Sequence, residues 1–163
     1  MGTQTTLQEL YIHELKDAFS AEKQILKALP KMEKASGHKE LQDAFRQHRE
    51  VTEEHVRRLE SILETLDVKP GGKKCKGMEG IIEEGEEMMK EAEGDTRDAA
   101  LISAAQRVEH YEIAAYGTLR TFASQLGREE DARILQMTLD EEGTADHELS
   151  RLAESRINRE ATA

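Results

Sequence analysis

Two carboxylates interrupt the apolar side of the segment RVEHYEIAAYG, residues 107–117. Apolar residues recur here every three or four positions, which indicates a helix with one buried face. That face includes Val108, and the next step along it falls on Glu112, with Glu109 one turn away. A carboxylate on a buried face is destabilising by roughly several kcal/mol unless a partner neutralises it. We therefore expect this helix to provide ligands for a cation.

Three other helical segments also place polar side chains among their apolar residues. Successive residues turn by about 100° around a helix, so the members of each inner face can be identified from the sequence. The first segment contributes a glutamate, the second two histidines, and the fourth a glutamate and an aspartate. These residues are Glu22, His48, His55, Glu142 and Asp146.

Folding the helices into two hairpins brings these groups to similar depths. The first hairpin places Glu22 beside the middle of the second helix. The second hairpin places Glu112 level with Glu142. It also places Glu109 close to Asp146. The polar groups are therefore expected to meet near the middle of a helical bundle.

Such a meeting of carboxylates favours a metal site. Carboxylates that converge in a low-dielectric interior repel one another, and a pair of cations removes that repulsion. Carboxylate and imidazole ligands suit iron, manganese or zinc, and four-helix bundles bind two such ions through inward-projecting glutamates and histidines. We predict two transition-metal ions, with iron ahead of manganese or zinc, bound by Glu22, His48, His55, Glu109, Glu112, Glu142 and Asp146.

Each of these side chains also has a purely structural interpretation. A single carboxylate on a helix face is usually a rim residue that extends to water, and for Glu109, at the flank of its face, that interpretation stays open. Histidines such as His48 and His55 are more often buried core residues than ligands, and only their position opposite the carboxylates favours a ligand role. The other four carboxylates would each have to reach water from one depth. We therefore favour metal binding for the group.

The segment HREVTEEH, residues 48–55, contains a further pair of glutamates that resembles a metal motif. However, helical rotation turns Glu50 by about 180° and Glu53 by about 120° from the apolar face. We expect both side chains to be exposed to solvent. The second helix then lacks the Glu-x-x-His motif that is usual in dimetal bundles.

Helix start and stop signals divide the chain into two helical hairpins. The first is expected to span residues 6–66 and to begin with a capping box formed by Thr6 and Glu9. The second is expected to span residues 96–158, followed by a frayed tail. The long crossover covers residues 67–95. This connectivity predicts an all-α, single-domain, ferritin-like four-helix bundle with a short extra helix in the crossover.

The crossover also carries apolar residues. Its glycine- and proline-rich start, DVKPGGKKCKG, cannot sustain a helix. The short helix that follows has an apolar side larger than one edge of a bundle needs. We therefore predict a homodimer, since a two-fold axis is the commonest closed symmetry. The apolar residues are Met78, Ile81, Ile82, Met88 and Met89.

Composition excludes several classes of partner. Charged residues make up 35% of the 163 residues, and the formal net charge is −11. This negative charge argues against nucleic acid and against an anionic membrane surface, and no apolar run approaches the ~20 residues of a membrane span. The single cysteine, Cys75, cannot form an internal disulfide. We therefore expect a reducing, cytoplasmic location.

Four stretches of the chain together resemble the YciE/YciF family of ferritin-like bacterial stress proteins. They are LYIHELKDAFSAEKQILKALPKM, KCKGMEGIIEE, DAALISAAQRVEHYEIAAYGTLRTFASQLG and TLDEEGTADHELSRLA. The resemblance extends over nearly the whole chain. It implies a helical bundle that dimerises and a rubrerythrin-like site for two metal ions, and it implies no established reaction.

The resemblance also implies roles for particular residues. Glu109 and Glu112 look like the paired glutamates of rubrerythrin. Glu142 and Asp146 look like its fourth-helix glutamate and the ligand four residues later, with aspartate in place of histidine. The rubredoxin-type cysteines are absent from the sequence, so the resemblance supplies no route for electrons to a peroxidase cycle.

Two functions of different classes follow. In the first, Glu22 and Glu112 are terminal ligands, Glu142 is a bridge, and Asp146 and His48 complete a dimetal site. This site would oxidise iron and reduce a small oxidant, either O₂ or peroxide. The alternative is a stress-related structural homodimer whose metal site is structural or empty. The sequence leaves open whether the protein is an enzyme.

Overall fold

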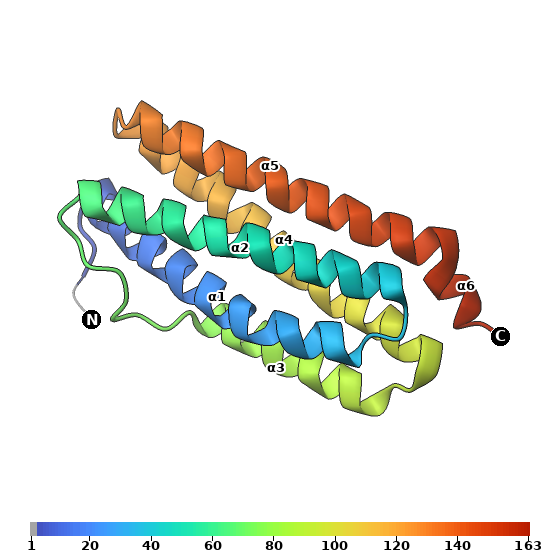
Figure 1. Cartoon of the computed structure of the whole chain (residues 1–163). Coiled ribbons are helices and arrows are strands. Elements are labelled where there is room, and N and C mark those ends of the chain that lie inside the picture. Colours follow the sequence, from blue (N-terminus) through green and yellow to red (C-terminus); the bar gives the residue numbers. More distant parts are fainter. Residues whose placement is uncertain (1–2) are drawn as a thin grey trace.

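The computed structural model describes residues 3–163 and is a bundle of helices (Figure 1). They are α1 (Leu7–Ala35), α2 (Lys39–Thr65), α3 (Lys76–Glu91), α4 (Gly94–Gln125), α5 (Glu129–Leu152) and α6 (Asn158–Glu160). A π-helical turn, Ala153–Ile157, joins α5 to α6. Within residues 3–163 there is no β-strand, and no helix is long and apolar enough to cross a bilayer.

The helices are connected as two hairpins and a crossover. α1 and α2 form one antiparallel hairpin, α4 and α5 form the other, and α3 lies against α4 and α1 (Figure 1). α2 and α4 run in the same direction, so the connection between them must return along the length of the bundle. This is the connectivity of a ferritin-like bundle. The predicted all-α, ferritin-like fold class is confirmed.

The helix ends agree closely with the sequence signals. The backbone N–H of Glu9 donates to Thr6 Oγ1 at 3.2 Å, and the N–H of Thr6 donates to Glu9 Oε2 at 3.1 Å, which is the expected capping box. α1 continues past Pro30 to its end at Ala35. α4 begins at Gly94, two residues earlier than predicted. Gly127 follows α4 with a φ of +71°, a left-handed conformation that glycine adopts freely.

The carboxyl-terminal segment is more ordered than predicted. The sequence predicts a frayed tail after residue 158, whereas the structure is helical to Glu160. Ile157 is buried in the core. Glu160 Oε2 lies 2.6 Å from His38 Nε2, and the other ring nitrogen of His38 lies 2.5 Å from Asp98 Oδ2. An ion pair with the turn between α1 and α2 thus orders the tail. Helical periodicity cannot reveal a contact between residues so far apart in the sequence.

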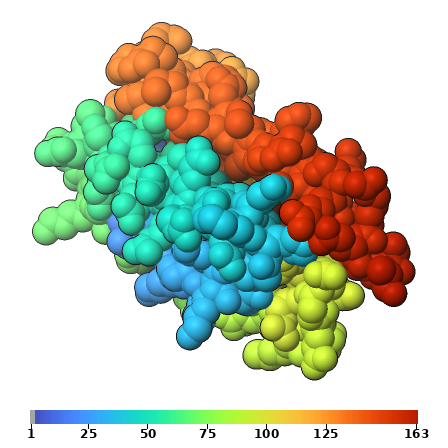
Figure 2. Space-filling model, turned by 45° about the vertical axis from the view of Figure 1, so that its right-hand side comes forward, coloured from blue at the N-terminus to red at the C-terminus, as the bar shows by residue number. Residues whose placement is uncertain are grey.

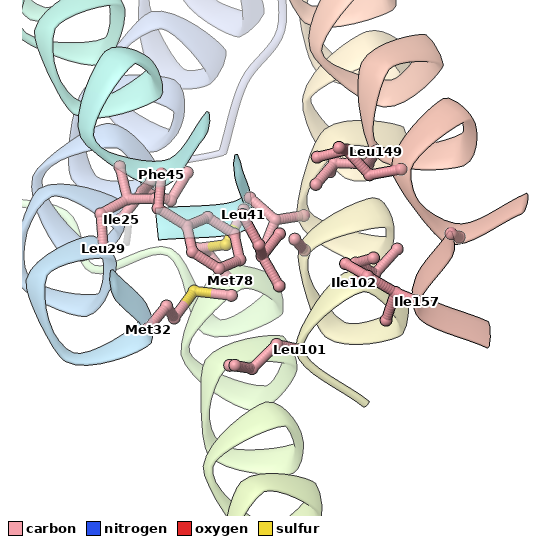
Figure 3. Close-up of a cluster of buried hydrophobic side chains, with 14 of the residues drawn as sticks. Ile25, Leu29, Met32, Leu41, Phe45, Met78, Leu101, Ile102, Leu149 and Ile157 are labelled. Carbon is pink, nitrogen blue, oxygen red and sulfur yellow. The ribbon is translucent and has the colours of Figure 1, made fainter. Parts of the chain in front are cut away.

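Apolar side chains fill the bundle in two clusters, one on each side of its middle. The first lies toward the α1–α2 turn and includes Ile25, Leu29, Met32, Leu41, Phe45, Met78, Leu101 and Leu149 (Figure 3). The second lies toward the opposite end and includes Tyr11, Leu15, Leu59, Ile62, Tyr116, Leu119 and Leu135. Between the two clusters the interior contains buried carboxylates.

α3 buries most of the apolar side that the sequence assigns to it. Met78 is fully buried, and Ile81, Ile82 and Met89 pack against the first cluster. Across the described part of the chain, the only exposed large apolar side chain is Met137. The surplus apolar surface is therefore smaller than the sequence suggests, because α1 and α4 already cover much of it. The homodimer itself stays a prediction.

Candidate metal centre

Six polar side chains from all four long helices meet between the two apolar clusters. They are Glu22 of α1, His48 and His55 of α2, Glu109 and Glu112 of α4, and Glu142 of α5. Five are at most 2% exposed, and the His48 side chain is 11% exposed. They form two groups that share Glu142. In each group, one ligand atom per residue lies within 4.8 Å of all the others.

The two oxygens of Glu142 face different histidines. Oε1 lies 2.9 Å from His55 Nδ1, which is also 3.2 Å from Glu22 Oε1. Oε2 lies 3.9 Å from His48 Nε2, which is also 3.3 Å from Glu109 Oε1. Glu142 therefore stands between a group with Glu22 and His55 and a group with His48, Glu109 and Glu112. Glu142 is thus the one residue that both groups share.

Eight ligand atoms of these six residues are buried without a hydrogen-bond partner. They are Glu22 Oε2, His48 Nε2, His55 Nδ1, Glu109 Oε2, both oxygens of Glu112 and both oxygens of Glu142. The contact between His55 and Glu142 is short but is not aligned as a hydrogen bond. Buried polar atoms in proteins are almost always paired. A concentration of unpaired oxygens and nitrogens that face one another therefore points to a ligand that they share.

Burial and mutual repulsion control the protonation of the cluster. Burial, and next the charge of Glu142, hold the pKa values of Glu109 and Glu112 well above the usual range. Burial acts against ionised Glu142 as well, but its contacts with His55 and Glu109 lower its pKa to about 2. Burial would lower the pKa of His55, yet Glu142 and Glu22 together raise it to about 10. Without a cation, the cluster therefore retains protons that ordinary carboxyl and imidazole groups release near neutral pH.

The donor set fits a pair of divalent transition metals. Four glutamates carry four negative charges when deprotonated, which two divalent ions would balance. Mixed carboxylate and imidazole donors are typical of iron, manganese and zinc sites. The three ligands of one group and the four of the other leave coordination positions for a small molecule.

Asp146 is the one predicted ligand that the structure places elsewhere. Its carboxylate lies 3.3 Å from His110 Nε2 and accepts a hydrogen bond from Gln106 Nε2 at 3.2 Å. Asp146 follows Glu142 by four residues, which is slightly more than one turn, so its side chain rotates toward the edge of α4. Glu109, for which the rim interpretation stayed open, is 2% exposed and belongs to the centre.

Glu50 and Glu53 are exposed on α2, as the rotation argument predicts. Thr52 occupies the inner position three residues before His55, where the usual motif has a glutamate. Thr52 is fully buried, and its hydroxyl donates to the carbonyl of His48 at 2.8 Å. α2 thus contributes two histidines, one on each side of Thr52, in place of the Glu-x-x-His pair.

Tyr116 and Glu141 contact the centre from outside, and Arg58 contacts Glu141 in turn. The Tyr116 hydroxyl donates to Glu22 Oε1 at 2.5 Å. His55 Nε2 lies 2.8 Å from Glu141 Oε2, and Arg58 donates to both Glu141 oxygens at 2.7 and 3.1 Å. In the sequence, Glu141 and Arg58 resemble ordinary charged residues of a helix surface, so their roles cannot be predicted from it. The one available signal was that Glu141 adjoins Glu142 and Arg58 follows His55 by three residues.

Comparison with known proteins identifies relatives along nearly the whole chain. The model of the family described as "Domain of unknown function (DUF892)" matches residues 6–162. Protein YciF of Escherichia coli (strain K12) is 44% identical over 158 residues, which cover 96% of this chain and 95% of that protein.

Solved structures agree with this relationship. The crystal structure of the E. coli stress protein YciF matches with a TM-score of 0.91 at 44% identity, covering 95% of this chain and 99% of that one. YcfI of Rhodopseudomonas palustris, a candidate structural protein, matches at 0.88 and 37% identity, covering 92% and 98%. A protein of Xanthomonas campestris pv. campestris shares the fold, with a TM-score of 0.74 at 22% identity and 92% of each chain covered. The chain therefore belongs to the DUF892 family together with YciF, as its sequence resemblance predicts.

Proposed function

We propose that this protein binds two transition-metal ions between its four long helices and uses them in a bacterial stress response. The supporting observation is the set of eight buried ligand atoms without partners, contributed by six residues. Iron is the first candidate metal, with manganese or zinc as alternatives. The relative YciF is named as a stress protein, which supports the assignment to stress.

Each half of the centre would hold one ion. Glu22 and His55 would bind the first, His48, Glu109 and Glu112 would bind the second, and Glu142 would bridge them. If iron were bound here, Fe(II) would be oxidised and would supply the electrons that reduce O₂ or peroxide.

The surrounding residues orient these ligands. When His55 Nε2 carries the proton, it donates to Glu141, and Nδ1 is left free to bind metal. Arg58 offsets the charge that Glu141 would otherwise add to the site. The Tyr116 hydroxyl holds one oxygen of Glu22, so the other oxygen, which has no partner, is the one directed to a metal.

Metal content of the protein purified without chelators tests this function. We expect about two transition-metal ions per chain. Glu142→Ala should reduce the content below that of any single terminal-ligand variant, because both ions lose a ligand. Glu53→Ala, on the exposed face of α2, is the matched control and should retain the wild-type content. A folded wild type that binds no transition metal when iron, manganese or zinc is supplied would refute the proposal.

A second candidate function is a stress-related structural homodimer in which any metal serves only to stabilise the fold. Two observations favour it. YcfI is named as a candidate structural protein. The single cysteine, Cys75, is fully buried at the amino-terminal end of α3 and so offers no exposed thiol for electron transfer. Oxygen or peroxide consumption by iron-loaded protein separates the two functions. Turnover supports the redox function, and full metal occupancy without turnover supports the structural one.

A further inference from the structure

A cavity of about 680 Å³ lies beside the metal centre, in the half of the bundle nearer the α1–α2 turn. Its walls come from α1, α2, α3, α4 and α5 and are mainly apolar or small. They include Leu29, Phe45, Ile82, Ala105, Ala145 and Leu149. Cavities of this volume, with apolar walls and a few polar groups at one point, are typical of small-molecule binding sites between helices.

Small side chains create this space. Ala44 on α2 and Ala145 on α5 both line the cavity, where longer residues would close it. α2 and α5 form neighbouring ridges on the molecular surface, and the amino-terminal end of α2 lies beside the carboxyl-terminal part of α5 (Figure 2). Exposed residues such as Glu40 and Arg151 also line the cavity, so it is open to solvent on one side. Apolar walls at a protein surface commonly mark a binding site, so a space of this size suggests an occupant.

The cavity reaches the metal centre at one end. His48 and Glu109 both belong to its wall. Glu109 is 2% exposed, and its Oε2 and the Nε2 of His48 have no hydrogen-bond partner. A molecule in the cavity would thus place one end beside two of the proposed ligands.

The shape suits an extended molecule. The wall runs along α2 from Glu40 to Val51 and along α5 from Asp140 to Leu152. At a rise of 1.5 Å per residue these stretches are about 16 and 18 Å long. A linear apolar chain fits such a space better than a compact ring system does.

The charges at the wall select against anions. Its acidic residues on α2 and α5 are Glu40, Asp43, Asp140, Glu141 and Glu148, and its basic residues are Arg151 and, on α1, Lys31. Asp43, Glu141 and Glu148 pair with Arg46, Arg58 and Arg151, so Glu40 and Asp140 contribute most to the negative charge at the wall. The whole chain carries a net charge of −11. Such a field repels a carboxylate or phosphate headgroup and tolerates a neutral or cationic one.

We propose that the cavity binds a neutral or cationic molecule with a linear apolar chain, one end of which lies against His48 and Glu109. A role for this molecule as the reductant or substrate of the metal centre rests on the proposed function. The binding itself does not, because the cavity walls are formed by the fold.

Calorimetric titration of the full chain with three probes of equal chain length tests the proposal: dodecanol, dodecylamine and dodecanoate, each kept below its micelle concentration. We expect dodecanol or dodecylamine to bind at about one molecule per chain, and dodecanoate to bind at least about tenfold more weakly. Absence of binding by both the alcohol and the amine would overturn the proposal, including the case in which a second subunit covers the cavity. Tighter binding of dodecanoate would overturn the charge argument.

Variants that fill the cavity complete the test. Ala44→Trp and Ala145→Trp, made separately, should each weaken probe binding by at least about tenfold, since the indole occupies the space. Ala114→Trp, on the exposed face of α4, is the matched control and should bind as wild type. Unchanged binding in both filled variants would place the probe elsewhere and refute the proposal.

Metal content measured on the same samples keeps the two proposals distinguishable. Probe binding by a protein that takes up no metal refutes the proposed function and supports the cavity site. A protein that binds two metal ions per chain but no probe supports the proposed function and refutes the cavity site.

Discussion

Replacing Glu112 by leucine should stabilise the metal-free protein and reduce the stabilisation that it gains from iron. Glu112 is 2% exposed, and neither of its oxygens has a hydrogen-bond partner. Burial raises the pKa of Glu112 well above the usual range, which means that the ionised carboxylate destabilises the folded state. Leucine fills a similar volume and brings no polar atom into the interior.

The size of the effect follows from these two features. Replacing buried charged groups by apolar residues of similar volume often stabilises proteins by about 1–4 kcal/mol. For a chain of this length, 1 kcal/mol raises the melting temperature by about 2–4 °C. In contrast, the free energy of unfolding of the wild type should rise by about 2.7 kcal/mol when the free metal concentration is about a hundred times the dissociation constant. Glu112→Leu loses one ligand of the second ion and should gain clearly less.

Thermal melts with and without iron, together with metal analysis, measure both effects. Glu112→Gln is the informative companion, because it weakens ligation and still buries a polar amide. It should melt below Glu112→Leu in the metal-free state. Full metal occupancy in Glu112→Leu would show that this residue is no ligand, and a lower metal-free melting temperature than wild type would contradict the argument from unpaired burial.

Further predictions concern pH, helix rotation and assembly. In urea melts, the metal-free protein should be more stable at about pH 6 than at about pH 8. The raised pKa values of Glu109 and Glu112 let the folded state keep protons that the unfolded chain has released. Each such proton lowers the free energy of unfolding by about 1.4 kcal/mol for every unit by which the pH rises. Equal stability at both pH values would mean that these carboxyls are not protonated. His48→Ala should lower metal content while Glu53→Ala does not, and the reverse result would contradict the observed rotation of α2. If the protein is a homodimer through α3, the double variant Ile82→Lys and Met89→Lys should sediment as a monomer, whereas a wild type that is monomeric at tens of micromolar would remove this hypothesis.

The sequence predicts those members of the buried polar cluster that interrupt regular apolar faces. Glu22, Glu112 and Glu142 each stand where a helical repeat requires an apolar residue, so rotation alone identifies them. The four helices and their order follow from capping residues, glycines and the long crossover in the same way. These features depend on local sequence, and the structure agrees with them.

The remaining features depend on contacts between helices. Asp146 and Glu141 lie on the same helix as Glu142, yet the first turns toward His110 and the second toward His55. Which of these neighbours faces the centre depends on the rotation of α5 about its axis relative to α2 and α4. Side chains one residue apart point about 100° away from each other around a helix. The ordered tail likewise depends on His38, whose two acidic partners come from distant segments.

The six proposed ligands are divided equally between the hairpins, three from α1 and α2 and three from α4 and α5. This division has a consequence for the order of folding. Each hairpin is joined by a short turn and can form from contacts that are near in sequence, which favours early formation. The bridging glutamate and the histidines come together only when one hairpin docks on the other, so neither hairpin alone offers a complete site. Tight metal binding would then be a late step that reports docking, and a chain with only one hairpin assembled would leave its ions in solution.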